Sequence, residues 1–224
     1  MIVHDLSKDS GLVERIYATR KARRRVDRGK HAVFDTGDGN CIKFYPLEDS
    51  RVFATIQHLT RTRLKWLGLL TPIPRGIVRC GVLSSDSERF RCLPSEKLAR
   101  VPLARSVWGL YMEKIEGQTL NKVENGRLTP RIVQTARSIV NTLLNNDVVI
   151  VDSLILHNML LSPSGTIYLI DPESYVFHDF NPDEHQHYHG RNLCMIASSL
   201  NYLERRALQN TPQEPSPSQD EENL

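Results

Sequence analysis

The segment from residue 147 to residue 173, DVVIVDSLILHNMLLSPSGTIYLIDPE, constrains the fold more than any other part of the chain. It predicts an apolar strand, a tight loop ending in Asn158, a short strand, a Ser-Pro-Ser-Gly turn and a strand ending in Asp171. A hairpin of two short strands would bring Asp171, thirteen residues further on, back to Asn158. Amide and carboxylate oxygens suit Mg²⁺ that bridges the phosphates of a nucleotide. By itself, the segment equally fits an ordinary turn in which Asp171 caps a strand end.

Two segments that precede this one add information through their order. GDGNCIKFYP, residues 37 to 46, predicts a hairpin whose second strand carries Lys43. GLYMEKIEGQTL, residues 109 to 120, predicts an apolar strand that runs into Glu113, followed by a turn at Gly117. Taken singly, Lys43 reads as an ordinary edge-strand lysine and Gly117 as a common turn residue.

The chain order of these elements resembles that of the protein kinase-like superfamily. A lysine strand, a helix, a hinge strand, a second helix, the Asn158 loop and the Asp171 strand follow one another over residues 30 to 175. The resemblance implies an α+β, two-lobed protein kinase-like fold with a small β-rich N-lobe and a reduced helical C-lobe. We expect the N-lobe at residues 1–113 and the C-lobe at residues 114–210.

Further expectations concern the tail and a narrower relationship. The acidic tail at residues 211–224 is rich in Pro, Ser and Glu and is predicted to be disordered. The strand CIKFY, the stretch RLKWLGLLTPIPRG and a serine in the catalytic loop are similar to those of small bacterial YrbL-type proteins.

The resemblance assigns roles to single residues and implies ATP and Mg²⁺ as cofactors. Asn158 and Asp171 would hold the metal, and Lys43 would contact the α- and β-phosphates. Upstream of the strand HAVF, the stretch VDRGKH contains Gly29 as its single glycine, and no GxGxxG loop is present. The residues expected at the nucleotide are Gly29, Lys43 and, through their backbone groups at the adenine edge, Met112, Glu113 and Lys114.

The catalytic loop departs from the kinase pattern at its base. Five residues before Asn158, where kinases have the aspartate that accepts the proton of the substrate hydroxyl, the chain has Ser153. A serine cannot serve as that base, but a one-residue bulge would present the neighbouring Asp152 instead. Asp152 and Ser153 are therefore both candidates for the catalytic position. Loss of the base would slow phosphoryl transfer but need not abolish it, because catalysis there rests mainly on positioning and on stabilisation of phosphate charge.

The first predicted helix, at about residues 49 to 67, also departs from the pattern. It contains no glutamate to pair with the strand lysine, and only Gln57, or Glu48 just before the helix, could substitute. Glu173, two residues after Asp171, is either a second carboxylate near the metal or a solvent-facing loop acid. The apolar face of this helix is predicted to consist of Val52, Ile56, Leu59, Leu64 and Leu67.

Length and composition limit the remaining possibilities. A chain of 224 residues, 40% hydrophobic, can bury a core as one unit or as two small lobes. Helices near 130 to 146 and 190 to 208 leave little room for substrate-docking helices. The acceptor would then be small, or a protein held by another surface. The four cysteines show no CxxC spacing, and no apolar run approaches the ~20 residues of a membrane span. Both observations favour a cytoplasmic setting. Export as a bacterial effector stays open.

Two charged segments have competing interpretations. Residues 15 to 30 contain eight Lys and Arg residues and one acidic residue, Asp27. This segment could bind phosphates, nucleic acid or an acidic partner, or it could be a solvated helix face. Tyr17 is the one aromatic residue among these charges, too few for a row of stacked bases, which argues against a nucleic-acid partner. The His-rich residues 178 to 190 favour an exposed loop that titrates near neutrality over a transition-metal site.

The sequence thus favours an ATP- and Mg²⁺-dependent phosphotransferase with a hydroxyl acceptor, on a protein Ser or Thr or on a small molecule. The alternative is a pseudokinase, a nucleotide-binding regulatory or scaffold module. A distant third is a nucleic-acid-binding protein that uses the Arg-rich segment.

Overall fold

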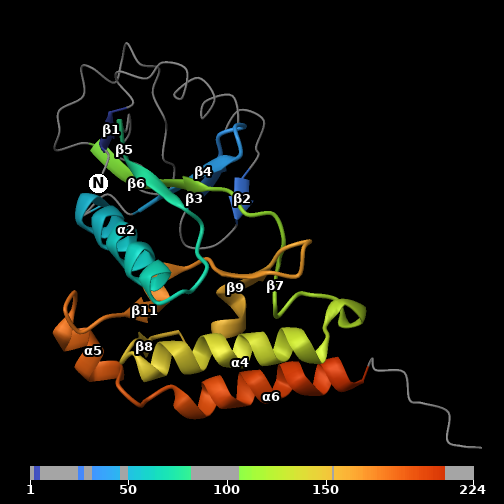
Figure 1. Cartoon of the computed structure of the whole chain (residues 1–224). Coiled ribbons are helices and arrows are strands. Elements are labelled where there is room, and N and C mark those ends of the chain that lie inside the picture. The colour runs from blue at the N-terminus through green and yellow to red at the C-terminus, as the bar shows by residue number, and fades with distance from the viewer. Residues whose placement is uncertain are drawn as a thin grey trace, which may run out of the picture.

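The computed structural model describes residues 3–5, 25–27, 32–45, 50–81, 106–152 and 154–209. A β-rich upper part is followed by a lower part that is rich in helices (Figure 1). The predicted α+β class, with strands gathered in the N-terminal half and helices in the C-terminal half, is confirmed. The predictions that lie outside the described residues concern Gly29, Glu48, Ser153, most of the basic stretch and the acidic tail.

A six-stranded sheet forms the upper part, in the order β1-β5-β6-β4-β3-β2. Neighbouring strands are antiparallel except β1 and β5, which run parallel. The strands are β1 (Val3–Asp5), β2 (Arg25–Asp27), β3 (Ala32–Asp35), β4 (Asn40–Phe44), β5 (Pro74–Gly81) and β6 (Ser106–Glu113).

The hairpin of β3 and β4 places Lys43 near the centre of this sheet. Gly37 and Gly39 adopt φ of 79° and 78°, values that glycine tolerates better than other residues, and Asp38 accepts the Asn40 N–H. The strand β4 lies between β3 and β6, with Lys43 opposite Leu110 of β6. The alternative of an ordinary edge-strand lysine is therefore wrong.

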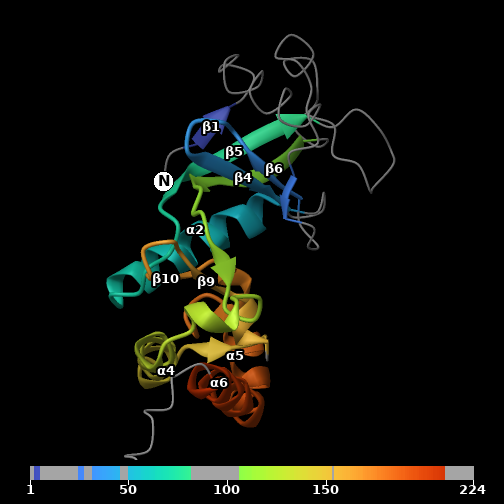
Figure 2. The same ribbon diagram turned by 90° about the vertical axis from the view of Figure 1, so that its right-hand side faces the viewer.

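The helix α2 (Ser50–Trp66) packs against β5 and β6, between the sheet and the lower part (Figure 2). Its predicted apolar face is largely wrong: Val52 and Leu59 are 54% and 42% exposed, and of the five predicted residues Leu64 alone is fully buried. The helix turns a different row inward because its inner face covers polar loop segments as well as the sheet. Its buried side chains are Ser50, Ala54, Gln57, Thr60, Arg61 and Leu64.

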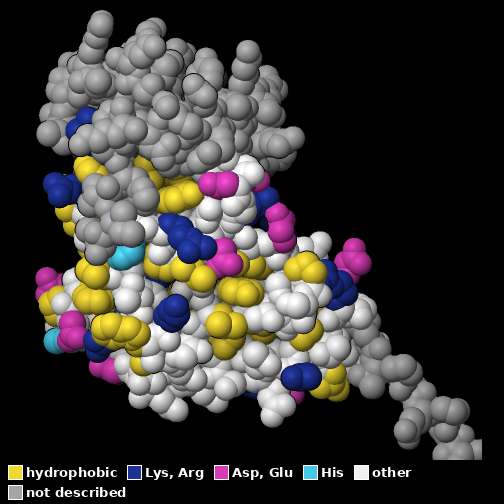
Figure 3. All heavy atoms as spheres, turned by 45° about the horizontal axis from the view of Figure 1, so that its top comes forward, with side chains coloured by type: hydrophobic (Ala, Val, Ile, Leu, Met, Phe, Trp, Pro, Cys, Tyr) yellow, Lys and Arg dark blue, Asp and Glu magenta, His cyan; other side chains and the backbone are white. Residues whose placement is uncertain are grey.

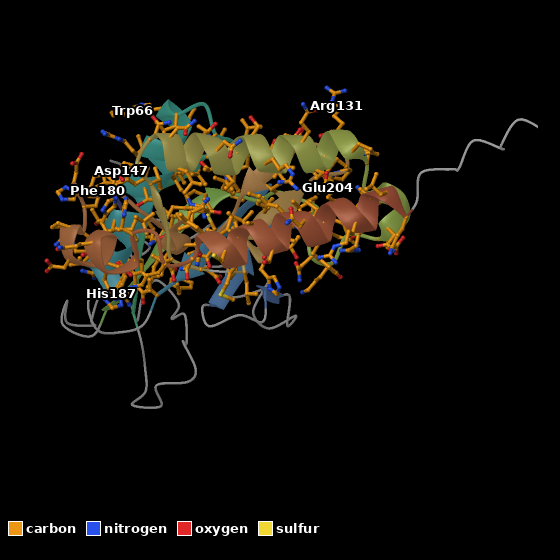
Figure 4. The ribbon with its side chains drawn as sticks, turned by 90° about the horizontal axis from the view of Figure 1, so that it is seen from below. Trp66, Arg131, Asp147, Phe180, His187 and Glu204 are labelled. Atoms are coloured by element: carbon orange, nitrogen blue, oxygen red, sulfur yellow. The ribbon has the colours of Figure 1, made fainter. Side chains whose placement is uncertain are left out.

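The lower part contains two long helices that lie side by side and antiparallel, α4 (Pro130–Asn145) and α6 (Leu193–Leu208) (Figures 1 and 4). α4 starts at the Thr129 cap, whose side chain accepts the Ile132 N–H, with Pro130 in the first turn. Glu204 of α6, labelled in Figure 4, forms an ion pair with Arg137 of α4 at 2.7 Å. The apolar residues of both helices join one core with the short strands above them.

Short strands and turns connect the two parts. β6 ends at Glu113, and Gly117 leads into β7 (Gln118–Thr119). A three-stranded sheet has the order β10-β9-β7 and a two-stranded sheet pairs β8 with β11. These strands are β8 (Val149–Ile150), β9 (Met159–Leu161), β10 (Ile167–Leu169) and β11 (Tyr175–Val176). None of the described helices is both long enough and apolar enough to cross a membrane.

Part of the His-rich segment forms the helix α5 (Pro182–Tyr188), so the predicted loop is wrong there, whereas His178, His187 and His189 are exposed as predicted. Asn181 caps this helix through its side chain, and Pro182 takes the first helical position. His185 is buried, and its Nε2 lies 2.9 Å from the carbonyl oxygen of Asp147.

Candidate active site

Lys43 joins the upper sheet to the segment that follows β10. Its Nζ donates a hydrogen bond to Asp171 Oδ1 at 2.8 Å and lies 2.8 Å from Glu173 Oε1. The Lys43 side chain is 8% exposed, whereas the two carboxylates are 35% and 30% exposed. The ammonium therefore lies inside the protein, and the carboxylates face the solvent in part.

The β9–β10 hairpin brings Asn158 and Asp171 to the same end. Leu169 pairs with Met159, and the Ile170 N–H donates to the carbonyl oxygen of Asn158 at 3.0 Å. Asp171 follows directly, at the start of the 3₁₀ turn Pro172–Ser174. The Ser-Pro-Ser-Gly turn closes the other end.

Asn158 is buried and holds the catalytic loop to the Asp171 segment. Its Nδ2 donates to Asp152 Oδ2 at 3.1 Å and to Ser174 Oγ at 2.8 Å. Among the described residues, both hydrogen bonds of the Asn158 side chain use Nδ2, so its Oδ1 is available as a ligand. Asp152 is oriented further by the Leu154 N–H, which donates to its Oδ1 at 2.8 Å. Asp152 thus belongs to the same cluster as Asn158.

Arg61 is a site residue that the sequence reasoning missed. It is fully buried on the inner face of α2, and its Nη2 donates to the carbonyl oxygen of Ile170 at 2.7 Å. Burial lowers the pKa of the Arg61 guanidinium, and the surrounding groups, Tyr45 first and then Asp171, oppose this effect. Arg61 therefore ties α2 to the residue that precedes Asp171. The row Ala54, Gln57, Arg61 and Leu64 has helical spacing, but its two long polar side chains give no signal for a buried face.

Gln57 does not take the role expected of it. Its side chain is buried one turn before Arg61, but within the described part of the chain its Oε1 has no hydrogen-bond partner. The expectation that Gln57 orients Lys43 by a hydrogen bond is wrong in this structure, because Asp171 and Glu173 hold the ammonium instead.

Neutral aromatic and thiol groups surround the buried cations. Burial raises the pKa of the Tyr45 phenol, and Glu173 and Asp171 raise it further. Burial also raises the pKa of Tyr175 and brings that of Cys41 to about 11. All three groups are therefore uncharged near neutral pH, and the charge of this region comes from Lys, Arg, Asp and Glu.

The strand end expected at the adenine is already engaged by protein groups. The N–H of Glu113 donates to the carbonyl oxygen of Ile73 and that of Lys114 to the carbonyl oxygen of Gly39, both at 2.9 Å. The Met112 side chain belongs to the apolar core of the upper sheet. Lys114 Nζ donates to Asp35 at 2.8 Å and also contacts Glu116, and these hydrogen bonds raise its pKa.

The donor set fits a metal that arrives with phosphates. Among the described residues, no group of three or more His, Cys, Asp or Glu side chains is placed to hold a metal ion. Mg²⁺ typically takes one or two protein carboxylates and completes its octahedron with waters and substrate phosphates. Asn158 and Asp171 offer an amide and a carboxylate oxygen of that kind. The His-rich segment offers no metal site among its described residues.

The chain was compared with protein families, curated proteins and solved structures. No family model and no curated protein matches the chain. One similar solved structure is the Rio2 kinase-ADP/Mg²⁺-phosphoaspartate complex from Chaetomium thermophilum, with a TM-score of 0.44 and 13% identity over 90% of this chain and 62% of that one. Another is WbdD, with a TM-score of 0.36 and 17% identity over 65% of this chain and 30% of that one. The chain thus spans less than two thirds of the length of either protein.

Proposed function

We propose that the protein is an ATP- and Mg²⁺-dependent phosphotransferase of the protein kinase-like superfamily, which transfers the γ-phosphate to a hydroxyl acceptor. One observation carries the proposal: groups from three distant segments meet at one place. Lys43 of β4 contacts Asp171 after β10, and Asn158 joins Asp152 to the same segment. A lysine, an amide, a metal-type carboxylate and a second carboxylate are the parts that phosphoryl transfer requires.

Each group has a proposed role. Lys43 would bind the phosphates, while Asn158 Oδ1 and Asp171 would hold Mg²⁺, which when bound neutralises phosphate charge. Asp152 would accept the proton of the acceptor hydroxyl, because Asn158 and the Leu154 N–H fix its carboxylate.

Adenine is proposed to bind beside the backbone of Met112, Glu113 and Lys114. Binding through the N–H groups of Glu113 and Lys114 requires that they leave their present acceptors on Ile73 and Gly39. The narrower relation to YrbL-type bacterial proteins also remains a proposal, and it rests on the sequence stretches alone.

A pseudokinase is the second candidate, and the Lys43–Asp171 hydrogen bond favours it. Lys43 holds the carboxylate that would bind the metal, and the buried face of α2 has no carboxylate to hold Lys43 instead. In a regulatory module this contact would persist. In an enzyme, nucleotide and metal must separate the two side chains.

Thermal unfolding tests the nucleotide site. ATP with Mg²⁺ at a hundred times its Kd should stabilise the folded state by about 2.7 kcal/mol, which corresponds to a rise in Tm of about 5–10 °C for a chain of this size. Asp171→Ala should lose the metal-dependent part of that rise. Asp179→Ala is the control, because Asp179 is exposed and contacts only Arg63 at 3.7 Å among the described ion pairs. No rise for the wild type at millimolar nucleotide would refute the proposal.

A further inference from the structure

The buried face of α2 presents a cation where a carboxylate was expected. At the level of Asp171 it offers Arg61, and its other buried polar side chains, Ser50, Gln57 and Thr60, are uncharged. Arg61 cannot pair with Lys43, since both side chains are positive. The partner of Lys43 must therefore come from elsewhere.

Glu173 supplies that partner from the 3₁₀ turn after β10. Its Oε1 lies 2.8 Å from Lys43 Nζ. Glu173 and Asp171 both act electrostatically on the buried Arg61 and raise its pKa. The close contact of Glu173, at 2.8 Å, is with Lys43.

The turn that carries Glu173 is fixed on both sides. Pro172 restricts the backbone before it, and Ser174 after it donates its N–H to the Asp171 carbonyl oxygen at 3.2 Å. The carbonyl oxygen of Ser174 accepts the Val151 N–H at 3.0 Å, and its Oγ accepts from Asn158. The backbone around Glu173 is therefore held by hydrogen bonds of the catalytic segments, and α2 packs against the same turn.

We infer that Glu173 is the positioning residue for Lys43, in the place of a helix carboxylate. The inference rests on the proposed function. With Asp171 bound to Mg²⁺, Glu173 would still contact the Lys43 ammonium. Lys43 would therefore stay directed at the phosphates. The contrasting role for Glu173 is a second metal ligand, which would act on the metal without Lys43.

A double-mutant cycle on nucleotide affinity separates these roles. ATP binding is measured by titration calorimetry, with and without Mg²⁺, for the wild type, Glu173→Gln, Lys43→Met and the double variant. Glu173→Gln should weaken binding about tenfold in the wild-type background, as for the loss of a close charge pair. In the Lys43→Met background it should change affinity by less than about twofold. Glu173→Asp should recover part of the loss.

The matched control is Glu204→Gln, which removes a carboxylate paired with Arg137 at 2.7 Å between α6 and α4. It should leave ATP affinity unchanged. An effect of Glu173→Gln that persists at full size in the Lys43→Met background would overturn the inference, because a metal ligand would act without Lys43. If the wild type binds no ATP, the proposed function fails as well. If it binds ATP and loses affinity with Asp171→Ala but not with Glu173→Gln, the inference alone fails.

Discussion

Replacing Lys43 by Met should destabilise the folded protein and make it more responsive to Mg²⁺. Methionine keeps the apolar stem of the 8%-exposed side chain but removes the ammonium that contacts Asp171 and Glu173 at 2.8 Å. Two charged contacts would contribute about 3–6 kcal/mol if fully buried. Because the carboxylates are about a third exposed, solvent screening reduces this to about 2 kcal/mol. For a chain of this size that is a fall in Tm of about 4–8 °C.

The Mg²⁺ response follows from the same geometry. Without the ammonium, the Asp171 and Glu173 carboxylates near Arg61 lose their contact cation, so a divalent cation relieves their repulsion. Millimolar Mg²⁺ without nucleotide should then raise the Tm of Lys43→Met more than that of the wild type, as measured by differential scanning calorimetry. Lys122→Met, at an exposed position, is the control and should stay within about 0.5 kcal/mol. Equal Tm values for Lys43→Met and the wild type would refute this reasoning.

Three further outcomes are expected. Gly117→Ala should lower the free energy of unfolding by several kcal/mol in a denaturant titration. The reason is that φ of Gly117 is +155° and an added Cβ would overlap the carbonyl oxygen of Leu161. A loss of about 1 kcal/mol or less would contradict the clash. Cys41 should react with a thiol reagent at pH 8 far more slowly than exposed Cys194, as measured by peptide mass spectrometry. Cys41 is buried and its pKa is about 11. Equal rates for the two cysteines would contradict the burial of Cys41. Asp152→Asn should slow phosphate transfer about a hundredfold or more with ATP affinity unchanged; an unchanged rate would exclude it as the base.

Elements with strong local signals could be predicted from the sequence. The β3–β4 turn has Gly, Asp and Asn at the positions that need them. The helix expected near 130 to 146 appears as Pro130–Asn145, because a Thr cap, an N-terminal proline and an apolar row agree. The hairpin that returns Asp171 to Asn158 follows from the turn between two short apolar strands.

The remaining features depend on information that is not local. Which row of α2 faces inward is set by the sheet and by the Asp171 segment, so the burial of Arg61 could not be read from periodicity. The pairing of Lys43 with Glu173 needs both parts of the chain in place. The helix α5, by contrast, was missed although its signal was present, since Asn181 and Glu184 form a reciprocal cap.

The competing nucleic-acid interpretation rests on the Arg-rich segment, most of which lies outside the described residues. On the face in Figure 3, the coloured Lys and Arg side chains of the described residues are interspersed with acidic and apolar ones. A nucleic-acid-binding protein would instead show steeply salt-dependent affinity for any duplex, and Asp171→Ala would leave that affinity unchanged. Filter binding at two salt concentrations distinguishes this interpretation from a nucleotide site.

Transfer of labelled γ-phosphate distinguishes a phosphotransferase from a module that only binds nucleotide. Wild type and Asp171→Ala are incubated with γ-labelled ATP and Mg²⁺, and label in the protein, in added hydroxyl acceptors and in free phosphate is followed together. The wild type should transfer label or turn over ATP. Both Asp171→Ala and removal of Mg²⁺ should abolish this activity. Tight, metal-dependent ATP binding with no loss of the γ-phosphate would contradict the phosphotransferase and leave the pseudokinase.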